Sequence, residues 1–251
     1  QQASQAGQGA IAVLPVYGVL THRARDLSVS TPMTSTEVLS AQIRSAAANP
    51  DISAIVLDVD SPGGSVFGVQ EVGDTILSLR GSKPIIAVAN AKAASGAYWI
   101  ASQADEIAIT PSGSVGSIGV LMVHRDQSSK NERDGVKTTY IHAGKYKVEG
   151  NPDSPLDADA AGHMQSAVDS YYSAFVRAVA KGRGVSVDTV RGETFGQGRM
   201  VLAKDAVAAG MVNRIATLDQ VIADLSRPKR KTAGLHASTA AAQLAVLQAG
   251  A

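Results

Sequence analysis

Two side chains of this sequence, Ser95 and Lys147, are of the types that carry out acyl transfer. Ser95 stands between Ala94 and Gly96, and small residues of this kind let the backbone turn sharply and approach a substrate closely. No histidine or carboxylate beside Ser95 is placed to activate its hydroxyl. A lysine returning from a later loop can supply the base, so the two residues predict a Ser–Lys hydrolase.

The lysine segment offers two candidates for the base. A lysine accepts a proton near neutral pH only when burial in a dry pocket disfavours its ammonium form. Lys147 has apolar neighbours in Tyr146 and Val148, which predict such a pocket. Lys145 would point to the opposite face if the segment is extended. The pattern favours Lys147 and leaves Lys145 open as the alternative.

A second turn that could take part in the chemistry is Ser61-Pro-Gly-Gly64, which follows the β-branched run of residues 53–60. A glycine N–H of this turn, together with N–H groups at the helix start after Ser95, could stabilise the oxyanion of a tetrahedral intermediate. Both turns would lie at the carboxyl ends of adjacent parallel strands and face one cleft, whose edge could pair with an extended peptide. The alternative interpretation is a tight turn without a catalytic role.

Other polar residues offer rival chemistry. The five histidines are scattered without metal-ligand spacing, and among them His142 lies close enough to the lysine segment to be an alternative base. Asp58 and Asp60 end the strand before the glycine turn and could suggest a metal site. We expect Asp60 instead to cap or orient that turn. The sequence therefore predicts neither a metal nor a cofactor.

The elements that must position these residues alternate along the chain. Strands are expected over residues 10–16, 53–60, 84–89 and 106–110, and helices over residues 35–48, 66–80 and 95–103. This alternation indicates parallel βαβ units with right-handed crossovers. Later expectations are strands over 116–123 and 138–142 around a helix at 125–134, a long helix over 158–182, short helices at 186–191 and 203–210, and a closing element over 218–225.

Composition limits the possible function classes. The chain has 251 residues, 45% of them hydrophobic and 18% charged, a balance typical of a globular protein with one substantial core. A net charge of +1 gives no electrostatic argument for binding nucleic acid. Cysteine is absent, which fits a reducing cytosol. No apolar run approaches the roughly 20 residues that span a bilayer, so we expect no membrane anchor in this chain.

Four motifs, taken in order, resemble the signal peptide peptidase A family, and within it the phage capsid (prohead) protease branch. They are Ser61-Pro-Gly-Gly64, Ala94-Ser-Gly-Ala-Tyr98, Gly113-Ser-Val-Gly-Ser-Ile-Gly119 and Gly144-Lys-Tyr-Lys147. The resemblance covers about residues 10–225. Relatives often continue the lysine motif with an acidic residue, where this chain has Val148 and then Glu149, and many carry a membrane anchor that is missing here.

The resemblance implies a fold, a site and a setting. The fold would be α/β, with Clp-protease/crotonase-like repeated ββα units and helices packed on a parallel sheet. Ser95 would be the nucleophile, Lys147 the base, Gly64 and Gly96 the oxyanion N–H donors, and Ser117 the residue that orients the lysine. The function would be a serine endopeptidase that acts on extended or unfolded protein, as a homo-oligomer, in the maturation of capsid or scaffold proteins. It would work in the host cytoplasm, within an assembling procapsid.

Three alternatives remain open: a protease that degrades membrane-released peptides, a crotonase-like acyl-CoA enzyme, and a non-catalytic scaffold component. The domain prediction is a disordered lead over residues 1–9, a peptidase domain over 10–226 and a flexible basic and Ala-rich tail over 227–251. We also expect the protein to process its own tail.

Overall fold

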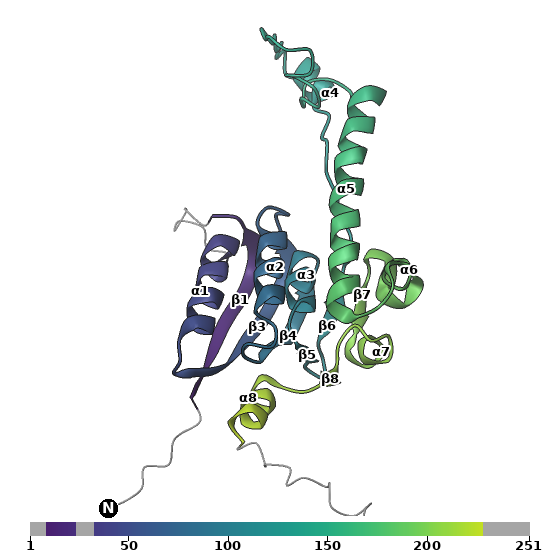
Figure 1. Cartoon of the computed structure of the whole chain (residues 1–251). Helices are drawn as coiled ribbons and strands as arrows, with labels where there is room; N and C mark the ends of the chain where they lie inside the picture. Colours follow the sequence, from purple (N-terminus) through teal and green to yellow (C-terminus); the bar gives the residue numbers. More distant parts are fainter. Residues whose placement is uncertain (1–8, 24–32, 228–251) are drawn as a thin grey trace, which may run out of the picture.

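The computed structural model describes residues 9–23 and 33–227, which fold around one predominantly parallel β-sheet (Figure 1). Six strands run parallel in the order β2-β1-β3-β4-β5-β8. Two short strands extend the sheet beside the end of β4: β6 pairs parallel with β4, and β7 pairs antiparallel with β6. The strands are β1 (Ala10–Thr21), β2 (Met33–Ser35), β3 (Ile52–Gly64), β4 (Ile85–Ala94), β5 (Glu106–Ile109), β6 (Ser114–Gly116), β7 (Met200–Leu202) and β8 (Arg214–Ile215).

The central strands form because their residues are apolar on both faces. In β3, every residue from Ala54 to Val59 is buried, as expected for an inner strand of a parallel sheet that is covered on both sides. Leu57 and Val59 belong to the larger core on one face, whereas Val56 belongs to a smaller core on the other. The predicted βαβ alternation is therefore correct for this part of the chain.

Three helices cover the larger core, namely α1 (Thr36–Ala48), α2 (Val69–Leu79) and α3 (Gly96–Ser102), and they lie side by side on one face of the sheet (Figure 1). The helix α8 (Leu218–Ser226) covers part of the opposite face. The capping residue of α1 is Ser35, whose hydroxyl accepts the Val38 N–H.

The long helix α5 (Ala158–Arg183) packs only its C-terminal half on this body. Phe175, Val176 and Val179 are buried there, and the Phe175 ring stacks on Trp99 of α3 with 4.9 Å between centroids. The segment after α5 contains α6 (Val187–Arg191), a 3-10 helix η1 (Glu193–Gly198) and α7 (Ala203–Ala208). The helix α7 is shorter than the predicted 203–210, since Ala209 is its C-cap and Gly210 after it adopts a left-handed φ of 76°.

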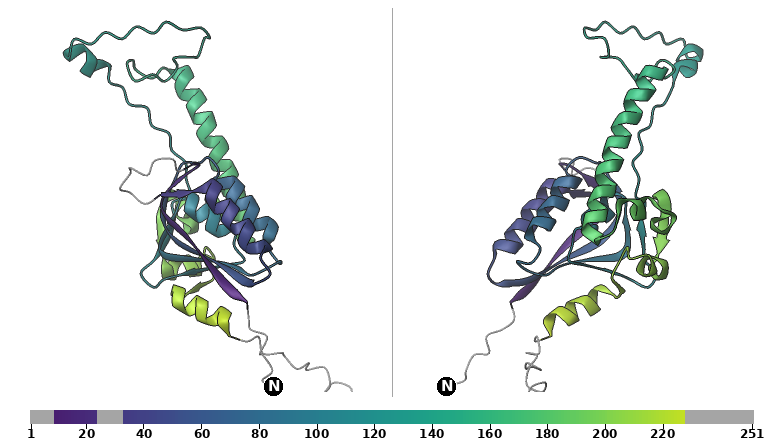
Figure 2. Two further views of the ribbon diagram at one scale, coloured as in Figure 1. Left: turned by 90° about the vertical axis from the view of Figure 1, so that its left-hand side faces the viewer. Right: turned by 45° about the vertical axis from the view of Figure 1, so that its right-hand side comes forward.

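Residues 119–157, which we call the arm, leave the body after β6 and return at the start of α5. Both views in Figure 2 show the arm and the N-terminal half of α5 projecting well beyond the sheet. The arm contains α4 (Ser128–Arg133), shorter than the helix predicted for 125–134. The strands predicted over 116–123 and 138–142 were wrong: β6 ends at Gly116, and residues 138–142 form no strand. Beyond Gly116, no described strand pairs with either segment, and β-forming residues alone do not make a sheet there.

The arm holds its shape through polar contacts. Its two limbs are joined where the Gln127 N–H donates to the Pro152 carbonyl at 2.7 Å. Asp153 accepts hydrogen bonds from the Tyr140 hydroxyl at 2.5 Å and the Asn131 amide at 2.7 Å. These hydrogen bonds hold the pKa of Asp153 below its usual value. Large apolar side chains of the arm remain exposed, among them Leu121 (81%), Val123 (65%) and Ile141 (97%).

The lead (1–9) and the tail (227–251) predicted from the sequence lie almost wholly outside the described residues, to which they contribute only Gly9 and Arg227. Among the described helices, none is at once long enough and apolar enough to cross a bilayer.

Candidate active site

Ser95 lies at the junction of β4 and α3 in a conformation that L-residues rarely adopt. Its φ is 53° and its ψ is −128°, and such a left-handed backbone costs free energy that the surrounding structure must offset. Two backbone hydrogen bonds hold it: its N–H donates to the Gly116 carbonyl at 2.8 Å, and its carbonyl accepts the Trp99 N–H at 3.0 Å. The Ser95 hydroxyl does not cap α3. The half-buried hydroxyl is therefore available for chemistry.

The helix that carries Ser95 is rigid. All seven residues of α3 are buried, and the Tyr98 hydroxyl donates to the Met211 carbonyl at 2.8 Å. Burial raises the pKa of Tyr98, so this hydroxyl stays protonated and bonded. Gly96, the first residue of α3, is tightly packed, because a Cβ there would lie 3.2 Å from the Val69 side chain, which would have to shift slightly. These contacts fix the direction of the N–H groups at the start of α3.

The glycine turn at the end of β3 lies against Ser95. A Cβ built on Gly63 would lie 2.7 Å from the Ser95 Cβ and 3.0 Å from the Gly96 nitrogen, and the Gly63 φ of 87° also suits only glycine. Gly63 is buried and Gly64 is exposed. Sequence reasoning named Gly64 and missed the contact made by Gly63, although both belong to the same motif.

Ser117 lies next to Ser95 at the same edge of the sheet. Gly116 of β6 pairs with Ala94 of β4, so the two serines follow paired residues on adjacent parallel strands. Ser117 also has a left-handed φ, 52°, and its N–H donates to the Arg199 carbonyl at 2.9 Å. A Cβ on Gly116 would lie 2.7 Å from that carbonyl oxygen. The site thus contains two strained serines side by side.

Lys147 belongs to the arm and lies outside this cluster. Within one chain, the hydrogen bonds of the described residues include none between Lys147 and Ser95. The Lys147 side chain is exposed, contrary to the dry pocket expected for it, because the arm packs few apolar groups around residues 144–148. Lys145 differs: its ammonium donates to the Tyr146 hydroxyl at 2.8 Å and lies 4.6 Å from the centroid of that ring.

A cavity of about 400 Å³ lies where the chain passes from the glycine turn into α2. Its walls come from the segment just after the glycine turn, from α3 and from α5, and they include Phe67, Trp99 and Tyr171. Phe67 is 63% exposed and Trp99 is almost buried, so aromatic surface runs from the opening to the floor. His22 and Glu71 add polar groups to the lining. This cavity can accept an apolar side chain of moderate size.

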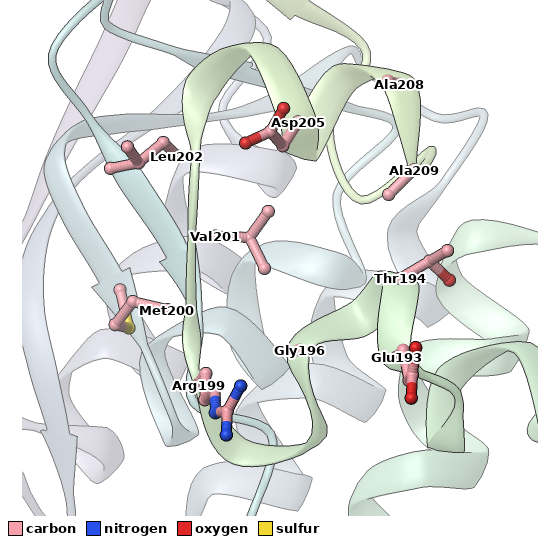
Figure 3. A pocket seen from close by; sticks show the side chains of 10 residues that line it. All are labelled: Glu193, Thr194, Gly196, Arg199, Met200, Val201, Leu202, Asp205, Ala208 and Ala209. Carbon is pink, nitrogen blue, oxygen red and sulfur yellow. The ribbon is translucent and has the colours of Figure 1, made fainter.

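A second cavity, of about 600 Å³, lies between β7, η1 and α7 (Figure 3). Val201 points into it, while Met200 and Leu202 project on the other side of β7. Its wall includes Arg199, the residue whose carbonyl holds Ser117. The strained turn before Arg199, with a left-handed φ of 47° at Gln197, therefore supports the backbone next to the site.

The other polar residues singled out from the sequence are engaged elsewhere. Asp58 is buried and accepts hydrogen bonds from the Tyr17 hydroxyl and, at 2.9 Å, from the Asn90 amide. The hydrogen bond to Asp58 raises the pKa of Tyr17 to about 12. Asp60 makes no hydrogen bond to the glycine turn within the described chain, so the expectation that it orients the turn was wrong. The Ser61 hydroxyl contacts the turn instead, accepting the Gly63 N–H at 3.1 Å.

The histidines do not approach Ser95 through any hydrogen bond of the described residues. His142 lies in the arm, exposed, with its Nδ1 3.2 Å from the Gly144 carbonyl, and His22 contacts the Thr36 hydroxyl. No group of three or more His, Asp or Glu side chains in residues 9–23 and 33–227 is arranged to hold a metal ion.

Comparison with known proteins identifies the family. Residues 78–232 match the model of peptidase family S49, and the chain belongs to this family of proteases. Capsid assembly protease C of Escherichia phage lambda is 34% identical over 84% of this chain and 48% of its own length. The putative signal peptide peptidase SppA of Enterococcus faecium is 26% identical over 88% of this chain and 64% of its own. The chain thus spans about half the length of the phage relative.

A solved structure, the serine-to-alanine mutant of the 1510-N membrane-bound stomatin-specific protease, aligns with a TM-score of 0.56 at 17% identity, over 86% of this chain and 84% of that chain. At this identity the likeness concerns the fold alone. The predicted family is confirmed, and so is the predicted α/β fold with helices packed on a parallel sheet.

Proposed function

We propose that this chain is a serine endopeptidase that cleaves peptide bonds through an acyl-enzyme formed on Ser95, with Lys147 as the general base. The observation that carries the proposal is the Ser95 turn. Its hydroxyl caps nothing, its backbone is strained, and it is enclosed by Gly63 on one side and Gly116 on the other. Strain of this kind concentrates at functional sites, and a nucleophile turn places the hydroxyl where a carbonyl carbon can approach.

The lysine comes from a second copy of the chain. In one chain the arm that carries Lys147 projects away from the body, and its apolar side chains have no cover (Figure 2). Exposed apolar groups of this kind mark interaction surfaces. Docking on another copy would bury Leu121, Val123 and Ile141, and it would bring Lys147 out of water beside a neighbouring Ser95. Burial there would favour the uncharged amine that a base requires.

The residues then act in sequence. The Lys147 amine accepts the Ser95 hydroxyl proton, and the serine oxygen attacks the carbonyl carbon of the peptide. The Gly64 and Gly96 N–H groups stabilise the oxyanion of the tetrahedral intermediate. Lys147 next protonates the leaving amine, and water repeats the sequence to release the acyl group. Ser117 orients the lysine by a hydrogen bond from its position beside Ser95.

Mixing two inactive variants tests both the dyad and its arrangement between copies. Ser95→Ala and Lys147→Ala should each abolish peptide hydrolysis, and Ser95→Ala should also abolish labelling by a serine-directed phosphonate. When equal amounts are unfolded and reassembled together, about a quarter of the sites regain an intact serine and an intact lysine if the two come from different copies. Hydrolysis should therefore return to about a quarter of the wild-type rate.

Lys145→Ala is the matched control. Lys145 is hydrogen-bonded to the Tyr146 hydroxyl, so this variant should hydrolyse peptides at close to the wild-type rate. Retained labelling in Ser95→Ala would remove the mechanism. Full activity in Lys147→Ala with loss in Lys145→Ala would assign the base to Lys145. A mixture that stays inactive would place both residues of each site in one chain.

The aromatic cavity that follows the glycine turn is the proposed subsite for a substrate side chain. Its volume of about 400 Å³ and its Phe67, Trp99 and Tyr171 walls suit an apolar residue. Phe67→Ala removes an exposed wall without touching the Ser95 turn. It should raise KM for peptides with a large apolar residue next to the cut more than for peptides with alanine there. An equal change for both peptides would reject this subsite.

The names of the relatives support a proposal for the substrate class. The phage lambda relative is named a capsid assembly protease. The alignment with it covers 84% of this chain and 48% of that protein. We therefore propose extended segments of capsid or scaffold proteins as substrates and the assembling procapsid in the host cytoplasm as the setting. Particles assembled with Ser95→Ala should keep these proteins at full length by mass spectrometry, and normally processed proteins in such particles would contradict this setting.

A further inference from the structure

We infer that the Ser61 hydroxyl is a positioning group for the oxyanion site: it holds the Gly63 N–H and so leaves the Gly64 N–H as the donor that faces Ser95. This inference rests on the proposed acyl-enzyme function. Ser61 is fully buried, at 0% exposure, although serine is a polar residue that is mostly found at the surface. Its hydroxyl must therefore be engaged, and both of its hydrogen bonds lead to backbone groups near the site.

The first hydrogen bond ties the turn to the neighbouring strand. The Ser61 hydroxyl donates to the Gly18 carbonyl of β1 at 2.6 Å. This contact lies where the pairing of β1 with β3 shifts register, between Tyr17 and Val19, and where Gly18 adopts a left-handed φ of 66°. A backbone carbonyl displaced from the regular ladder needs another donor, and Ser61 provides it.

The second hydrogen bond selects the glycine. The Ser61 oxygen accepts the Gly63 N–H at 3.1 Å, so this N–H points back into the turn rather than toward a substrate. The Ser65 N–H donates to the Leu20 carbonyl of β1 at 2.9 Å. Because successive backbone N–H groups of an extended chain point to opposite sides, the Gly64 N–H next to Ser65 points away from β1, toward the side of β3 on which β4 lies.

Loss of the Ser61 hydroxyl should therefore change the transition state more than substrate binding. In Ser61→Ala the Gly63 N–H is released and the turn can rotate, which misaligns the Gly64 donor. Removal of an oxyanion donor lowers kcat by about 100- to 1,000-fold in known cases, so a misaligned donor should lower kcat by about 10- to 100-fold with KM nearly unchanged. If Gly63 itself were the donor, releasing its N–H would leave kcat unchanged or raise it.

The chain offers a matched control on the same strand. The Ser53 hydroxyl donates to the Gly9 carbonyl at 2.7 Å, so it also ties β3 to the chain entering β1, but at the opposite end of the strand. Ser53→Ala should cost some stability and leave kcat at the wild-type value. Ser61→Thr keeps the hydroxyl and should recover most of the activity, which a purely volume-based effect would not produce.

The experiment measures kcat and KM for Ser61→Ala, Ser61→Thr, Ser53→Ala and Ser95→Ala, together with NMR hydrogen exchange at the Gly63 amide. The expected result is a fall in kcat alone for Ser61→Ala, recovery in Ser61→Thr, and faster Gly63 exchange in Ser61→Ala. If Ser61→Ala fails to fold, Ser61→Cys, which keeps the volume with a weak donor, is measured instead with the same expectation.

Unchanged kcat in a folded Ser61→Ala or Ser61→Cys protein, or a change confined to KM, would overturn the inference. Wild-type hydrolysis by Ser95→Ala would instead remove the acyl-enzyme proposal, and the positioning role would fall with it. The Gly63 exchange rate reports the hydrogen bond independently of catalysis, so the two failures are distinguishable.

Discussion

Replacement of Gly63 by alanine tests the close approach of the glycine turn to Ser95. Two effects of the new methyl group must be separated: strain in the Gly63 backbone and contact with the nucleophile. Gly81 provides the comparison, because its φ is +81°, close to the +87° of Gly63, but a Cβ there meets nothing within 4 Å. Gly81→Ala therefore carries the strain without the contact.

The expected magnitudes follow from the geometry. A left-handed backbone costs an L-residue about 1–2 kcal/mol, and both variants should lose this much stability. In Gly63→Ala the methyl carbon would start 2.7 Å from the Ser95 Cβ, whereas carbon atoms in contact settle at about 3.5–4.0 Å. Ser95 must then move by about 1 Å, and a misplacement of that size lowers the rate about 100-fold.

The assay pairs urea unfolding with single-turnover hydrolysis of a peptide substrate. The free energy of unfolding should fall by similar amounts in the two variants, with a further loss in Gly63→Ala from the displaced turn. Only Gly63→Ala should lose about 100-fold in the rate of acylation. The rate of phosphonate labelling should fall with it, because labelling needs the same serine geometry.

Wild-type acylation in a folded Gly63→Ala protein would refute the reasoning. It would mean that the turn can move away from Ser95 without cost, so that the distances around Gly63 do not set the position of the nucleophile. An equal loss of activity in Gly81→Ala would also refute it, since that residue has no contact with the site.

Three further predictions concern the core, the sheet and the tail. Phe175→Ala removes the ring stacked on Trp99 and should lower the free energy of unfolding by about 3–5 kcal/mol, measured by chemical denaturation. Tyr17 has a pKa raised to about 12 by its hydrogen bond to the buried Asp58 carboxylate. This hydrogen bond therefore stabilises the fold fully below pH ~10, and its contribution is lost as the pH rises through about 12. Tyr17→Phe should remove this part of the fall in unfolding free energy at alkaline pH, and an unchanged pH dependence would contradict the prediction. If the protein cleaves its own tail within residues 228–251, the intact mass of wild type should be lower than that of Ser95→Ala. Identical masses would reject self-processing.

We call Ser95 with the two turns around it the nucleophile half of the site. It could be predicted from the sequence because strands and turns depend on short local patterns of residues. A β-branched run followed by Ser61-Pro-Gly-Gly64 indicates a buried strand and a turn, and Ala94-Ser-Gly96 indicates a second turn before a helix. Parallel strands end at one edge, so the two turns had to meet there. The structure brings them together with Gly63 against Ser95.

Finer features of this half were not predictable, since they depend on register. The pairing of Ala94 with Gly116 decides that Ser117 lies beside Ser95, and no local pattern specifies which residues of β4 and β6 are opposite each other. The same holds for Ser61, whose hydroxyl reaches Gly18 only because β1 shifts its register at that point. The sequence shows a serine just before Pro-Gly-Gly, but it does not show that this serine is buried.

The strands predicted on either side of the lysine segment are absent for a different physical reason. Residues 116–123 and 138–142 contain several β-branched and aromatic residues, but within the described chain large apolar side chains of the arm such as Leu121 and Ile141 remain exposed. A sequence pattern indicates that an apolar side chain is favoured in a buried position. It does not indicate whether the same chain or another copy buries it. The arm thus combines hydrogen bonds of Asp153 within itself with exposed apolar side chains, which is the basis for proposing that it contacts a second copy.

The two halves therefore differ in how they are held. Contacts within one chain fix Ser95, Gly63 and Ser117, including backbone strain that only a rigid surrounding structure can maintain. No contact of comparable strength within the described chain fixes Lys147. On the proposed mechanism, the free energy that orders the nucleophile comes from folding, whereas the free energy that dehydrates and orders the base comes from association of copies. Peptide cleavage would then depend on assembly, because each chain positions its own Ser95 but receives the base, Lys147, from another copy.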